Sequence, residues 1–79
     1  MDKIIDSILN LYDDYSIPAG QGLPWGVFLQ NLSGKHKEPL LPELNKLIDL
    51  GFIKYNTLSQ VYTLNISTEN IRGKLNLNH

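Results

Sequence analysis

The residues of this 79-residue chain that are best suited to do chemistry are three adjacent ones, Lys35, His36 and Lys37. Lysine ammonium groups contact phosphates and give an affinity that does not depend on sequence and that weakens with salt. His36 has no second histidine or carboxylate at a ligand spacing, and His79 ends the chain, so metal binding is not indicated. The cluster therefore indicates a phosphate contact, with an ordinary solvated turn as the alternative.

Three further polar residues could contact a nucleic acid. Asn45 could pair with an adenine edge, and Lys46 could pair with guanine or phosphate. Lys54 follows in a segment with strand-like alternation, where it would lie on an outer face. However, residues 38–50 hold one lysine and three acids, which gives a net charge of −2 that phosphates would repel. Ordinary solvated helix residues are therefore the alternative for Asn45 and Lys46.

Catalytic chemistry is not indicated. The chain has no cysteine, which excludes disulfides, thiolate metal sites and cysteine nucleophiles. The sequence Gly20-Gln21-Gly22 lacks the strand and helix that flank a phosphate-binding loop, and no nucleophile–base pair can be recognised. We therefore expect no enzyme activity, no metal and no cofactor.

The charge distribution is uneven although the net charge is only −1. Residues 1–33 carry a net charge of −3, and residues 34–79 carry +2. The second half is thus mildly basic, but less so than a typical DNA-binding domain. The N-terminus has acids where a signal peptide has bases, and no apolar run approaches the roughly 18 residues of a membrane span. These features predict a soluble cytoplasmic protein with no membrane partner.

The length and the apolar periodicity predict one domain, residues 1–79, that is mainly α-helical with a small β-hairpin. Apolar residues at helical spacing predict helices over about 2–15, 24–33 and 39–50. Pro24 suits the first turn of the second helix, and Gly51 suits the left-handed residue that follows the third. Residues 16–23 are rich in proline and glycine, which predicts a loop.

The C-terminal third predicts two strands and a tail. Ile53 and Tyr55 alternate with polar residues, as do Tyr62 and Leu64, which predicts a hairpin over about 52–66. Residues 67–79 form the tail. Within it, residues 67–70 could cap a short last helix that places Ile71 inward.

The sequence "LNKLIDLGFIKY" followed by "VYTLN" resembles the end of a winged helix-turn-helix domain, and the order of three helices and a hairpin is similar as well. The resemblance covers about residues 2–66, with Asn65 where threonine is usual in the family. It implies a recognition helix over 39–50 that enters the major groove of DNA and a hairpin that acts as the wing. The Lys35–Lys37 turn would then lie beside the DNA backbone.

Two functions follow from these observations. The first is double-stranded DNA binding by a small transcriptional regulator, and its binding residues would be Lys35, His36, Lys37, Asn45, Lys46 and Lys54. The second is a winged helix that binds a protein and no DNA. The usual function of the fold favours the first, whereas the acidic third helix and the uncharged hairpin tip, residues 56–60, favour the second.

Three aromatic residues could either belong to the core or form a surface that binds a partner. Trp25 could supply core area or act as an exposed anchor for a partner. Tyr12 and Tyr15 could pack under the loop at 16–23, or they could form a homodimer face together with Leu11.

Overall fold

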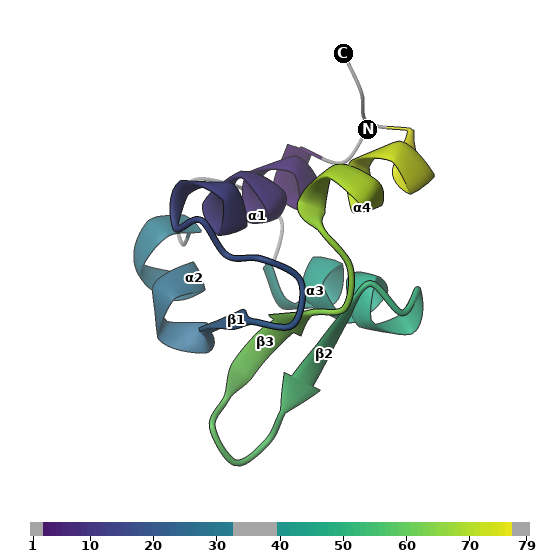
Figure 1. Ribbon diagram of the computed structural model, residues 1–79. Coiled ribbons are helices and arrows are strands. Elements are labelled where there is room, and N and C mark those ends of the chain that lie inside the picture. The colour runs from purple at the N-terminus through teal and green to yellow at the C-terminus, as the bar shows by residue number, and fades with distance from the viewer. Residues whose placement is uncertain (1–2, 33–39, 77–79) are drawn as a thin grey trace.

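The computed structural model describes residues 3–32 and 40–76, and its architecture is α+β, as predicted (Figure 1). Helices and strands follow one another in the order α1 (Lys3–Asp14), β1 (Gly22–Pro24), α2 (Trp25–Leu32), α3 (Leu40–Asp49), β2 (Ile53–Asn56), β3 (Val61–Leu64) and α4 (Thr68–Leu75). None of the described helices is long and apolar enough to cross a membrane.

Helix α1 buries a wide apolar arc. Its spacing of i, i+3 and i+4 brings six side chains into the core, namely Ile4, Ile5, Ile8, Leu9, Leu11 and Tyr12. Tyr12 has no exposed surface, and its hydroxyl donates a 2.7 Å hydrogen bond to the Tyr62 carbonyl. Burial raises the pKa of Tyr12, so the ring stays neutral. Tyr12 and Leu11 are both buried, so of the three residues considered for a homodimer face only Tyr15 is exposed.

Strand β1 was not predicted, since residues 16–23 were expected to form a loop. It pairs with β3 in an antiparallel ladder, and the strand order of the sheet is β1-β3-β2. Pro24 ends this edge strand and does not open α2, which begins at Trp25. An edge strand tolerates proline because one side of it needs no ladder hydrogen bond. The Trp25 N–H then donates to the Gln60 carbonyl at 2.9 Å, which ties the start of α2 to the hairpin.

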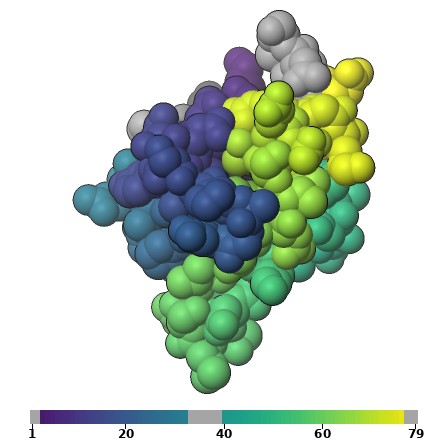
Figure 2. Space-filling view, viewed as in Figure 1, coloured from purple at the N-terminus to yellow at the C-terminus, as the bar shows by residue number. Residues whose placement is uncertain are grey.

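The predicted hairpin is present as β2 and β3, and it projects from the body of the molecule (Figure 2). Its tip is held by the Asn56 side chain, whose Oδ1 accepts from the N–H groups of Leu58 and Ser59 at 2.9 and 3.1 Å. Gln60 closes the turn with a left-handed φ of 57°. Gly51, two residues after the end of α3, has a φ of 82°, as predicted for the left-handed residue that follows this helix.

Helix α4 replaces most of the predicted tail and lies beside α1 (Figure 1). The predicted cap is confirmed, because the Ser67 hydroxyl accepts a 3.2 Å hydrogen bond from the Asn70 N–H. Ile71 is fully buried, as expected. Asp13 is unfavourable at the negative end of α1, but its carboxylate contacts α4, where it accepts from Thr68 Oγ1 at 2.5 Å and from Arg72 at 3.2 Å. These bonds explain why an acid stands at the end of α1.

Candidate functional site between α3 and the hairpin

A hollow of about 420 Å³ lies between α3, the start of α2 and the hairpin. We call it the α3–hairpin groove, and its lining consists of Trp25, Leu41, Asn45, Ile48, Tyr55, Gln60 and Tyr62. The lining is mostly apolar and aromatic with two amide side chains, which is the usual composition of a binding pocket.

Helix α3 supplies one wall. Leu41, Asn45 and Ile48 stand at i, i+4 and i+7, so they share one face of the helix. Leu44 and Leu47 lie on the adjoining face and are fully buried, which fixes the rotation of α3 about its axis. The Leu41 side chain is 46% exposed and so remains available at the mouth of the groove.

The sheet and α2 supply the aromatic wall. Tyr55 and Tyr62 are cross-strand partners on β2 and β3, and their ring centroids lie 4.6 Å apart. Trp25 also packs against Tyr62, with ring centroids 6.0 Å apart. Tyr62 is only 5% exposed and Tyr55 is 37% exposed, so Tyr62 forms the floor and Tyr55 forms a rim. Burial and the neighbouring Tyr55 raise the pKa of Tyr62, which keeps this ring uncharged at neutral pH.

The structure brings only one of the described DNA-binding candidates into the groove, and that residue is Asn45. Lys46 is exposed on α3 and lies 3.6 Å from Glu43 in an ion pair. Lys54 is exposed on β2, where it pairs with Thr63. Because neighbouring residues of a strand point to opposite faces, Lys54 lies on the other side of the sheet from Tyr55. Lys35, His36 and Lys37 lie outside the described residues.

The electrostatics of this region are nearly neutral. Residues 40–64 carry two lysines and two acids, and the hairpin tip from Asn56 to Gln60 carries no charge. The tip instead presents Leu58, which is 95% exposed. The described part of this face therefore offers apolar and aromatic surface and no concentration of positive charge.

The sequence pointed to Trp25 but not to the groove. Trp25 packs against the core, as the first alternative for it predicts, and its partly exposed side chain also lines the groove, whereas its role as an anchor for a partner stays a prediction. Leu41 and Ile48 belong to the apolar spacing that predicted the third helix, and this spacing alone does not distinguish a buried residue from one that lines a groove. Among the described residues, no group of three His, Cys, Asp or Glu side chains could hold a metal ion.

Comparisons with protein-family models, with curated proteins and with solved structures gave no match.

Proposed function

We propose that this chain is a winged-helix domain that binds a protein partner through the α3–hairpin groove. The order of the elements supports this family, because three helices precede a hairpin that projects from the body (Figures 1 and 2). In this reading α3 takes the place of the recognition helix and β2–β3 take the place of the wing. The short β1 would complete the sheet at the base of the wing.

The observation that carries the choice of a protein partner is the chemistry of the exposed face of α3. That face presents Leu41, Pro42 and Asp49 beside the polar Asn45 and Lys46, and the helix has a net charge of −1. DNA affinity comes mainly from cations placed against phosphates, and base readout needs donors and acceptors. Proline and leucine side chains supply no positive charge and no hydrogen-bond donors or acceptors. Exposed apolar side chains beside aromatic ones are instead typical of protein interfaces.

Leu41→Glu tests this proposal, and Leu50→Glu is its matched control. The two leucines are 46% and 49% exposed, but only Leu41 lines the groove. We expect Leu41→Glu to lower the capture of the partner from host cells by at least about tenfold, the effect of a hot-spot residue. We expect Leu50→Glu to capture the partner as the original chain does. Equal capture by both variants, with both folded, would contradict the proposed surface.

DNA binding is the second candidate function. It is favoured by the exposure of Asn45 on α3 beside Lys46 and by the exposure of Lys54 on the hairpin. Lys35 and Lys37, which lie outside the described residues, would add phosphate contacts. The mark of this function would be an affinity that falls steeply as the salt concentration rises.

A further inference from the structure

We propose that the α3–hairpin groove takes a cationic side chain of the partner, an arginine or a methylated lysine. This inference rests on the proposed function, because it names the chemistry of the segment that the groove binds.

Three aromatic rings gather in one small site. Trp25, Tyr55 and Tyr62 all line the groove, and the Tyr62 ring contacts both of the others, with centroids 6.0 Å from Trp25 and 4.6 Å from Tyr55. Aromatic rings carry a negative potential on their faces, which attracts arginine and quaternary ammonium groups. Several rings around one site hold such a cation better than they hold a neutral group of the same size.

The polar groups of the groove can accept hydrogen bonds. Asn45 and Gln60 bring side-chain carbonyl oxygens, and guanidinium groups carry donors only. The Gln60 backbone is held by hydrogen bonds to Asn56 at 2.7 Å and to Trp25 at 2.9 Å, which fixes the place where its side chain starts.

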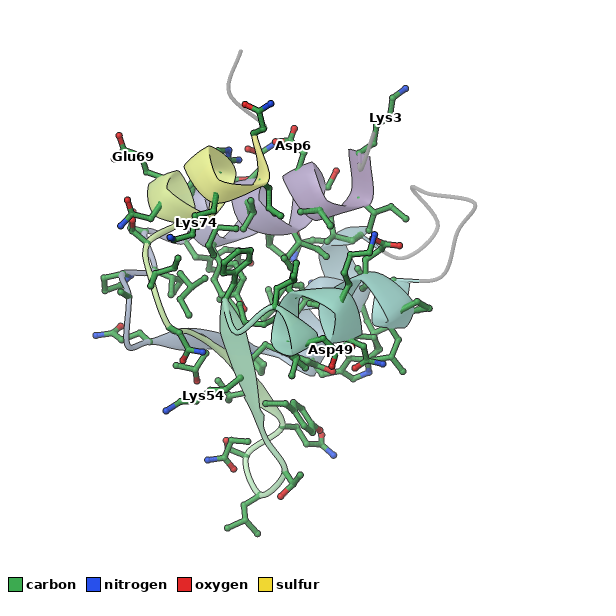
Figure 3. The ribbon with its side chains drawn as sticks, turned by 90° about the vertical axis from the view of Figure 1, so that its right-hand side faces the viewer. Lys3, Asp6, Asp49, Lys54, Glu69 and Lys74 are labelled. Carbon is green, nitrogen blue, oxygen red and sulfur yellow. The ribbon has the colours of Figure 1, made fainter. Side chains whose placement is uncertain are left out.

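The charged side chains near the groove favour a cation as its occupant. Asp49 follows Ile48 on α3 and is exposed, and Figure 3 shows it at the lower edge of the helix, with Lys54 pointing away on the other side of the hairpin. None of the described residues that line the groove is basic. The lining itself carries no charge, Asp49 stands one residue from Ile48, and Lys46, which stands beside Asn45, is in an ion pair with Glu43. A cation that enters the groove therefore has an acid on the same helix and its one neighbouring lysine paired with a carboxylate.

The size of the groove agrees with this occupant. Its volume of about 420 Å³ falls within the range of roughly 300–1,000 Å³ that is common for small-ligand sites. The exposed rims at Leu41 and Tyr55 leave it open to a side chain that is carried on another protein.

Fluorescence of Trp25 provides a direct test, because it is the single tryptophan of the chain and it lines the groove. The cationic probes are acetyl-arginine amide and acetyl-trimethyllysine amide, and their neutral counterparts are acetyl-citrulline amide and acetyl-norleucine amide. We expect the cationic probes to change the emission in a saturable way and to bind about two- to fivefold more tightly than the neutral ones. Equal binding of neutral and cationic probes would overturn the inference in favour of a purely apolar site.

Variants of Tyr55 separate cation binding from simple apolar contact. Tyr55→Leu keeps apolar area but removes the ring, and Tyr55→Phe keeps the ring face. We expect the first to weaken the cationic probes about two- to fivefold and the second to bind them nearly as before. Tyr15→Leu is the control, since Tyr15 is 50% exposed and does not line the groove. Unchanged binding by Tyr55→Leu would contradict the aromatic site.

Substitution of Asp49 tests the charge argument. Asp49→Asn should weaken the cationic probes and leave the neutral ones unchanged, whereas Asp14→Asn, an exposed acid on α1, should affect neither. Different results would refute the proposed partner surface and the proposed cationic occupant. Loss of the partner by Leu41→Glu without binding of cationic probes would refute only this inference, and retention of the partner by Leu41→Glu would refute the proposed surface.

Discussion

Replacing Phe28 with alanine is expected to lower the free energy of unfolding by about 3–5 kcal/mol. Phe28 has no exposed surface, and its ring lies between Tyr12 and Tyr62, with centroids 5.6 Å from each at interplanar angles of 67° and 83°. The alanine variant loses the transfer energy of the ring, leaves a cavity and ends two edge-to-face contacts. A domain of this size has little stability to lose, so we expect much of the variant to be unfolded at 25 °C.

Denaturation by urea, followed by circular dichroism, measures this effect. Phe28→Leu should cost less, because it keeps most of the buried area, and it should remain folded for comparison. Tyr15→Ala is the surface control and should change the free energy of unfolding by about 0.5 kcal/mol or less, since Tyr15 is half exposed. A loss of less than about 1 kcal/mol for Phe28→Ala would mean that the aromatic cluster is not the centre of the core.

Gly22→Ala is expected to lower the free energy of unfolding by about 1–3 kcal/mol although it adds only a methyl group. A Cβ at Gly22 would clash with the backbone of β3, at the Tyr62 carbonyl and the Thr63 Cα. Backbone cannot move aside as a flexible side chain can, so β1 has to separate from β3. Because Trp25 follows β1 directly, this separation should also displace one wall of the α3–hairpin groove.

Gly73→Ala is the matched control for Gly22→Ala and should have the opposite sign. A Cβ at Gly73 would meet nothing within 4 Å, and alanine is preferred to glycine inside a helix such as α4 by about 0.5–1 kcal/mol. Urea denaturation of the two variants side by side should therefore move their midpoints in opposite directions. Similar midpoints for both would show that β1 does not pack against β3 as described.

The helices and the hairpin were predictable because local physics determines them. Apolar spacing located α1 and α3, and Gly51 marked the end of α3 because a left-handed residue is needed there. Alternation located β2 and β3, although Tyr55 proved more exposed than a residue on a fully buried face. Ser67 indicated the start of α4, because its hydroxyl can cap a helix, although residues 67–79 as a whole were predicted to form a tail.

Strand β1 could not be predicted, because its partner lies about forty residues away. Three residues, of which only Leu23 is buried, give no periodic signal, and their pairing with Val61–Thr63 exists only in the folded chain. Proline and glycine around it indicate a turn equally well. For the same reason, the role of Asp13 became apparent only when α4 was placed against α1.

Of the described residues expected to bind DNA, only Asn45 lines the groove, and Trp25, considered as an anchor for a partner, lines it as well. Most of the residues that were expected to bind DNA are charged. Lys46 and Lys54, which the structure describes, are not part of the groove lining. The groove itself joins Trp25, one face of α3 and the two paired tyrosines of the hairpin, and no local pattern links these three segments. Side chains that look like ordinary core residues in the sequence can thus form a site when they are only partly covered.

The most direct test of the central claim, that the α3–hairpin face binds protein and not DNA, is a titration against random-sequence duplex DNA at low and at moderate salt. We predict no binding at low salt, because the described part of this face has no excess of positive charge and even weak non-specific affinity would appear under that condition. Binding at low salt that weakens steeply as salt rises would contradict the claim and would assign the surface to DNA.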